Sequence, residues 1–96
     1  MAKPPRIERA SQRRLDKVRH LAPRFFQEVV GWDFAEVLVT DESDLRDFAD
    51  ITQDRKTQVD GMLDRMTVHY GVDARVARST MIVDLLELLA SRGVTR

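Results

Sequence analysis

Hydrophobic residues recur with helical spacing between Thr52 and Val72, in the segment TQDRKTQVDGMLDRMTVHYGV. At about 100° per residue, four further apolar side chains fall within roughly 60° of Val59, namely Met62, Leu63, Met66 and Tyr70. Asp50 or Thr52 is expected to cap the start of this helix, and Gly71 to end it after about five turns. The pattern predicts a central helix with one core-facing stripe, which the other elements must cover.

Two shorter apolar patterns come before this helix. Ser11 is expected to cap a first helix over residues 12–21, whose apolar residues recur at three-residue spacing. These residues are Leu15, Val18 and Leu21. Pro23 then either kinks the helix or opens a new one in its first turn, where the missing N–H costs nothing. The segment FFQEVV follows as two apolar turns, which Gly31 is expected to end.

The segment from Trp32 to Phe48 has no helical period. Residues 34–39 would fit a short strand, but no second strand pattern is present to pair with it, so we expect a long packed loop. Several capping residues precede Leu45 and Phe48. They predict one short helical turn that is anchored by these two apolar side chains.

After the central helix, residues 73–78 predict a brief turn with Val76 as its anchor. Ser79 or Thr80 is expected to cap a last helix. The apolar residues of that helix are Ile82, Leu85, Leu86 and Leu89. Gly93 lies where a left-handed terminator is expected, with Val94 placed for the accompanying hydrophobic contact.

Composition fits one small helical domain. The 96 residues are 43% hydrophobic and 33% charged, and no apolar run approaches the roughly 18 residues of a transmembrane helix. The absence of cysteine excludes disulfides and thiol nucleophiles, and no secretory signal pattern opens the chain, so a cytoplasmic location is expected. We predict an all-α protein with a flexible tail over residues 1–10 and a single helical domain over residues 11–96.

Charge is distributed unevenly along the chain. Residues 1–24 carry eight Lys or Arg against Glu8 and Asp16, a balance of +6, which residues 25–96 offset with −6. A basic N-terminal arm of this kind could bind nucleic acid, but it could equally fold back on the acidic body or stay solvated. Nucleic-acid binding through this arm is therefore an alternative hypothesis.

The order of the predicted parts follows a known pattern. A helix ending in glycine, FFQEVVGW, leads to the loop EVLVTDESDLRDF, a central helix ending in YGVD, a short turn, and a closing helix beginning STMIVDLLELL. This order resembles the acyl carrier protein family over about Phe25 to Ala90. The resemblance implies a small four-helix bundle with acyl-carrier-like topology, in which the central helix recognises partners.

In that family a prosthetic arm is attached to a serine inside an Asp-Ser-Leu triplet at the start of the second helix. The matching stretch here is Ala49-Asp50-Ile51-Thr52-Gln53, which has no serine. Thr52 is the nearest hydroxyl, and its simplest role is to cap the helix. We therefore expect no cofactor. Thr52 would carry one only if the chain is a divergent acyl or peptidyl carrier that is modified at a non-standard site.

No catalytic or metal-binding constellation is predicted. His20 and His69 are the only histidines, and no third ligand stands at a suitable spacing. A run of carboxylates lacks the glycine and the distal glutamate of a calcium loop, so it predicts a solvated acidic loop. Its members are Asp41, Glu42, Asp44, Asp47 and Asp50. Trp32 is either an exposed anchor or a lid on the core.

The outward face of the central helix is the predicted partner surface. Five residues lie within roughly 40° of the direction opposite Val59, and these are Asp54, Thr57, Gly61, Asp64 and Val68. Glycine inside a helix costs roughly 1 kcal/mol relative to alanine, so Gly61 either lets a neighbouring loop pass close by or admits a partner. The two aspartates would attract a basic surface. We hypothesise a small non-catalytic protein-interaction module.

Overall fold

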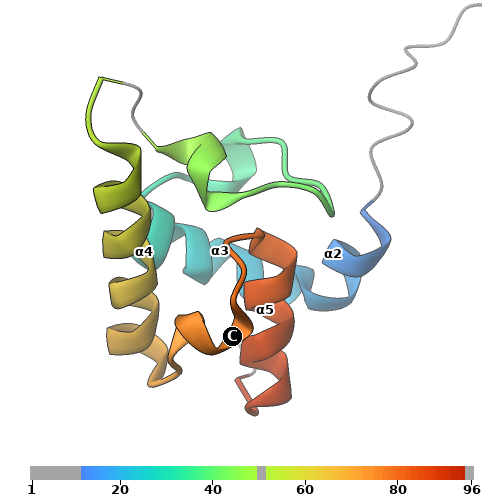
Figure 1. Ribbon diagram of the computed structural model, residues 1–96. Coiled ribbons are helices and arrows are strands. Elements are labelled where there is room, and N and C mark those ends of the chain that lie inside the picture. Colours follow the sequence, from blue (N-terminus) through green and yellow to red (C-terminus); the bar gives the residue numbers. More distant parts are fainter. Residues whose placement is uncertain (1–11, 50–51, 95–96) are drawn as a thin grey trace, which may run out of the picture.

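The computed structural model describes residues 12–49 and 52–94. Within these residues the protein is an all-α globule, in which three helical stretches and several 3-10 turns pack around one core (Figure 1). The N-terminal tail and the expected caps Ser11 and Asp50 lie outside the described residues. No helix within the described part is long and apolar enough to cross a membrane.

The first helical stretch runs without a break over residues 13–30, although its hydrogen-bond pattern changes along the way. It consists of α2 (Arg13–Val18), the 3-10 turn η1 (Arg19–Leu21), α3 (Ala22–Phe25) and the π-helical turn η2 (Phe26–Val30). Pro23 lies in the first turn of α3, the second of its two expected positions, because no N–H is required there. Gly31 ends the stretch in the left-handed region at φ 88°, as predicted.

A long connection without strands follows, as predicted. Its described residues form two 3-10 turns, η3 (Phe34–Glu36) and η4 (Leu45–Phe48). Leu45 is fully buried and Phe48 packs partly buried against the core, so both anchors of the predicted turn are confirmed. In Figure 1 this connection lies across one end of the molecule, above α3 and α5.

The central helix is α4 (Arg55–Tyr70), and it begins later than expected. Asp54, not Thr52, is its N-cap, since the Asp54 carboxylate accepts a hydrogen bond from the Lys56 N–H at 3.0 Å. The predicted stripe is confirmed, with Tyr70 only partly buried and the other four members buried: Val59, Met62, Leu63 and Met66. Gly71 ends the helix with φ 69°.

The turn after α4 is η5 (Ala74–Ala77), and its predicted anchor was wrong. Val76 is 58% exposed, whereas Ala74 is 1% exposed and belongs to the core. A 3-10 turn repeats every three residues, so Ala74 and Ala77 share the inner face and Val76 points outward.

The last helix is α5 (Ile82–Ser91), and the four apolar residues predicted for it are buried. Its N-cap is Met81, not Ser79 or Thr80. Ser79 instead accepts from the Met81 N–H at 3.1 Å and donates to Asp84 at 2.7 Å. At the other end the Val94 N–H donates to the Leu89 carbonyl at 3.0 Å after Gly93, which confirms the predicted glycine terminator.

The acidic loop is not simply solvated, which corrects a prediction. Asp41 is only 9% exposed, and its carboxylate accepts hydrogen bonds from the N–H groups of Arg14 and Leu15 at 3.2 and 2.9 Å. It thereby satisfies free amides at the start of α2, where Gln12 provides no side-chain cap. A carboxylate far along the chain thus docks the long connection onto the first helix.

Asp44 holds the same connection to the start of α5. Its carboxylate caps η4 and also accepts from the Thr80 hydroxyl at 2.8 Å. Backbone hydrogen bonds reinforce this latch, because the Leu45 N–H donates to Thr80 and the Ile82 N–H donates to Ser43, at 3.0 and 2.9 Å. Burial raises the pKa of Asp44, but the hydrogen bonds from Arg46 and Thr80 outweigh it and leave that pKa below its usual range.

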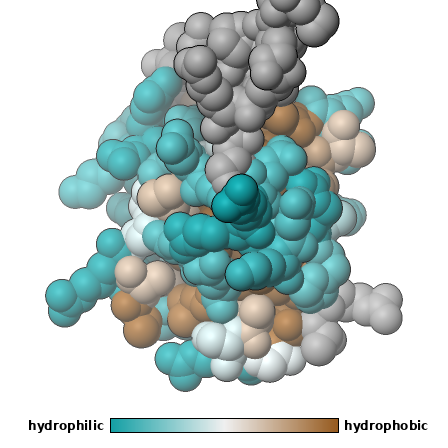
Figure 2. Space-filling view, turned by 90° about the vertical axis from the view of Figure 1, so that its right-hand side faces the viewer, coloured by the Kyte–Doolittle hydropathy of each residue, from teal (hydrophilic) through white to brown (hydrophobic). Residues whose placement is uncertain are grey.

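Two basic side chains near the start of the described chain form ion pairs with acidic residues of the same molecule. Arg14 pairs with Asp84 and Glu87 of α5 at 2.6 and 2.7 Å. Arg19 pairs with Asp16, one turn before it, at 2.6 Å. The side of the molecule that carries α2 is largely hydrophilic, and hydrophobic side chains reach it only in small groups (Figure 2).

The latch at Asp44 gives a pH-dependent stability. Folding lowers the pKa of Asp44, so its ionised carboxylate stabilises the folded protein at pH values above the pKa of the unfolded chain, about 3.9. This contribution is lost as the pH falls through the pKa of the folded protein. We expect Asp44→Asn to flatten the fall in unfolding free energy between about pH 5 and pH 2, measured by urea denaturation. Thr80→Val should act in the same direction but less strongly. An Asp44→Asn curve parallel to that of the parent would contradict the latch.

Candidate functional site

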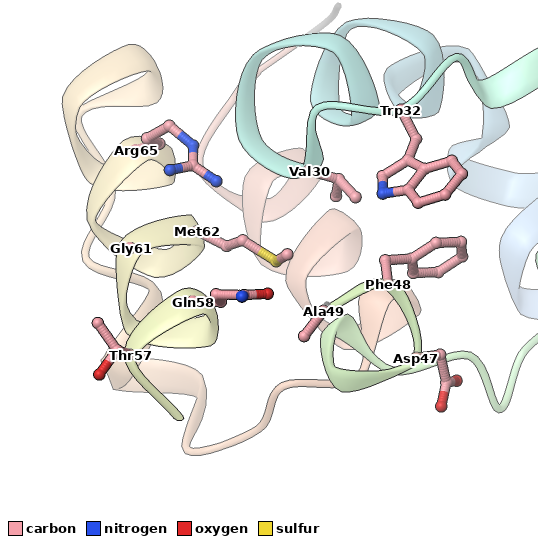
Figure 3. Close-up of a pocket in the computed structure, with 10 residues that line it drawn as sticks. All are labelled: Val30, Trp32, Asp47, Phe48, Ala49, Thr57, Gln58, Gly61, Met62 and Arg65. Carbon is pink, nitrogen blue, oxygen red and sulfur yellow. The ribbon is translucent and has the colours of Figure 1, made fainter. Parts of the chain in front are cut away.

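A groove of about 680 Å³ lies between α4 and the long connection. Residues at the ends of η2 and η4 and along α4 line it: Val30, Trp32, Asp47, Phe48, Ala49, Thr57, Gln58, Gly61, Met62 and Arg65. In Figure 3, Gln58 and Met62 face Trp32, Phe48 and Ala49 across the groove. The elements that meet here are far apart in the sequence, so only the folded chain creates this site.

Trp32 forms the aromatic rim of the groove. The left-handed Gly31 turns the chain sharply, and the Trp32 N–H donates back to the Phe26 carbonyl at 3.3 Å. The indole is 51% exposed, and it packs edge-on against the Phe48 ring with 6.3 Å between centroids. Phe48 in turn packs against the buried Phe26 at 5.3 Å. Trp32 is therefore half-exposed and packed against Phe48, as an exposed anchor would be, and its use by a partner stays a prediction.

Arg65 forms the opposite side of the groove and links α4 to the first helical stretch. Its Nε and Nη2 both donate to the Val29 carbonyl, at 2.9 and 2.7 Å. This carbonyl lies near the end of η2, where helical carbonyls lack partners within the helix. Nη1 has no hydrogen bond or ion pair among the described residues. The guanidinium is thus held in place while part of it stays available.

The guanidinium of Arg65 lies beside Gly61. Side chains of a helix lean toward its N-terminus, so Arg65 lies over the residue one turn before it. A Cβ built on Gly61 would meet Arg65 Nη1 at 3.5 Å, and among the described residues no atom outside the backbone of α4 and the two chain neighbours lies closer. No described loop therefore passes close to Gly61, and the close neighbour that the described residues provide belongs to the same helix.

The predicted partner surface is divided by the fold. Thr57 and Gly61 line the groove, whereas Asp54, Asp64 and Val68 do not. Asp54 caps α4 and accepts from the Thr57 hydroxyl at 2.8 Å, and this hydrogen bond lowers the pKa of its carboxyl group. Asp64 pairs with Arg75 of η5 at 2.7 Å. Val68 is 79% exposed, so it remains an apolar residue on the open face of α4.

Sequence reasoning singled out Trp32 and Phe48 without bringing them together in one site, and it gave Arg65 no role. Two signals were available for the aromatic pair, since Trp32 directly follows a helix-ending glycine and Phe48 closes the predicted turn. No sequence signal could give Arg65 its role, because its acceptor lies 36 residues away on another helix.

The described residues bring no three His, Asp or Glu side chains together as metal ligands. His69 lies beside Glu28, with 3.6 Å between Nδ1 and the carboxylate, at the junction of α4 with the first helical stretch.

Comparisons with protein-family models, with curated proteins and with solved structures gave no match for this chain. The function must therefore be argued from the groove itself.

The substitution Gly61→Ala measures how much helix stability this glycine costs. The added methyl group would sit at ordinary contact distance from Arg65, while alanine favours the helix by about 1 kcal/mol. We expect the melting temperature to rise by about 4–8 °C for each kcal/mol gained, measured by circular dichroism. Gly71→Ala is the matched control and should melt lower, because φ is 69° there. A lower melting temperature for Gly61→Ala would mean that Arg65 cannot accommodate the methyl group.

Proposed function

We propose that this protein is a small non-catalytic protein-interaction module that holds its partner in the groove between α4 and the pair Trp32–Phe48. The observation that carries the proposal is the half-exposed Trp32, which is fixed against Phe48 at the edge of an open groove. A rigid, exposed indole supplies a large contact area at little cost in conformational entropy.

The composition of the groove supports the same proposal. Tryptophan and arginine are the residue types that most often dominate binding energy at protein interfaces, and here they lie at opposite ends of one groove (Figure 3). Met62 adds a flexible apolar side chain between them. The exposed face of α4, which includes Thr57 and Val68, adjoins this groove and would extend the contact with a partner.

The acyl-carrier-like topology of a small four-helix bundle is also part of the proposal. Its support is the order of elements, since a helical stretch, a long connection ending in η4, the central α4, the short η5 and the closing α5 follow one another as in that family. In this comparison η5 takes the place of the short third helix. We propose that the chain shares this arrangement without carrying a prosthetic group.

The carrier alternative can be tested directly. Thr52 is exposed and precedes the N-cap Asp54 by two residues, so its hydroxyl stands outside α4. We expect the intact mass to stay unchanged after co-expression with a broad-specificity phosphopantetheinyl transferase. A carrier protein with the standard serine, expressed in parallel, shows that the enzyme is active. A mass increase by one prosthetic arm that Thr52→Val abolishes would establish the carrier reading instead.

Partner retention tests the interaction itself. We expect a protein that co-purifies with the tagged parent to be lost from Trp32→Ala, because truncating a central aromatic anchor costs about 2 kcal/mol or more of binding energy. Val76→Ala is the matched control: it removes an exposed apolar side chain of 58% exposure outside the groove, and it should retain the partner. Circular dichroism checks that both variants fold. Retention by Trp32→Ala at the level of the parent would contradict a partner site at this groove.

A further inference from the structure

We propose that the groove recognises an acidic amphipathic segment of the partner protein. In this arrangement a carboxylate of the segment binds the guanidinium of Arg65, and an apolar side chain packs against Trp32, Phe48 and Met62. The inference rests on the proposed function, because it specifies the chemistry of the partner that this groove would hold.

The geometry of Arg65 carries the inference. Two of its nitrogen atoms donate to the Val29 carbonyl at 2.9 and 2.7 Å, so the guanidinium is already ordered before any partner arrives. Nη1 keeps its two N–H donors without an acceptor among the described residues. A planar guanidinium with free donors matches a carboxylate in both shape and charge. Its fixed position reduces the entropy that binding would otherwise cost.

The charges around the groove favour an anionic ligand on this side. Among the described residues of the lining, Asp47 is the other charged one, and it lies at the opposite edge from Arg65 (Figure 3). Its carboxylate already accepts from the Asp44 N–H at 3.0 Å in the capping box of η4. Asp64, the acidic neighbour of Arg65 in sequence, is paired with Arg75 at 2.7 Å. The positive charge of Arg65 is therefore not neutralised by either carboxylate.

Charge alone would give only weak binding at such an exposed position. The apolar side chains beside it supply the larger contribution, since burying one leucine-sized side chain is worth about 1.5–3 kcal/mol. The carboxylate then fixes the register of the segment and selects acidic partners over neutral ones. The combination predicts a ligand that places an apolar and an acidic residue on the same face.

The test uses the parent chain and its single tryptophan, Trp32, whose fluorescence reports on this groove and on a smaller hollow beside Pro23 and Phe34. A variant of Arg65 is therefore needed to assign the signal. The probe is a synthetic helical peptide without tryptophan that repeats leucine and glutamate on one face, and its control replaces every glutamate by glutamine. We expect saturable binding of the glutamate peptide, about tenfold tighter than that of the glutamine peptide, because a charge-assisted hydrogen bond is worth about that factor.

Two variants assign this difference to Arg65. Arg65→Gln should bind both peptides equally, whereas Lys56→Gln, which removes the same charge from the same helix outside this groove, should keep the difference. Should Arg65→Gln fail to fold, the Nε–H signal of Arg65 in the parent decides by nuclear magnetic resonance. It should shift with the glutamate peptide and not with the glutamine peptide.

Equal affinity of the parent for both peptides would overturn the inference, and so would an unmoved Nε–H signal. No response of Trp32 up to about 1 mM of the glutamate peptide would overturn it as well. None of these results would decide the proposed function, because retention of a native partner by the parent and its loss from Trp32→Ala are measured without any peptide.

Discussion

The packing of Phe26 is the contact on which the rest of the site depends. The long connection has no strand and no full helix in its described part, so side chains must hold it in place. Phe26 is fully buried, and its ring lies 5.3 Å from the rings of both Phe34 and Phe48. Its carbonyl also accepts from the N–H groups of Gly31 and Trp32 at 2.6 and 3.3 Å. Phe26 therefore holds both Trp32 and Phe48, the two aromatic residues of the groove.

Carboxylates complete what this aromatic packing begins. Backbone N–H groups at helix starts need acceptors, and in this chain the acidic loop supplies them at positions distant in sequence. Asp41 serves the start of α2, while Asp44 serves η4 and reaches Thr80 just before α5. Two carboxylates of the loop that was predicted to be solvated are therefore part of the folded structure. Each carboxylate joins the connection to a helix that the apolar core also holds.

The sequence allowed the helices and most of the core to be predicted, because burial of one helix face imposes a period that a single chain displays. Val59 and Leu63 were recognised in this way, and both are buried. Val76 was assigned wrongly, since in a 3-10 turn of four residues the period is too short to show which side faces inward. The groove could not be predicted, because it forms where the ends of η2 and η4 come together with α4 after folding. The spacing of apolar residues along one helix carries no information about how separate elements pack against one another.

The position of Arg65 beside Gly61 bears both on the stability of α4 and on the proposed recognition of a partner. A glycine inside α4 weakens the helix, and the guanidinium that lies beside it reaches the Val29 carbonyl. The hydrogen bonds to that carbonyl join α4 to η2 and offset part of the cost. They also engage only one side of the guanidinium. The hydrogen bonds that satisfy the Val29 carbonyl thus leave an ordered cation at the edge of a groove with a mixed polar and apolar lining, so the contact that stabilises the packing of α4 also sets the position of the charge on which the proposed recognition rests.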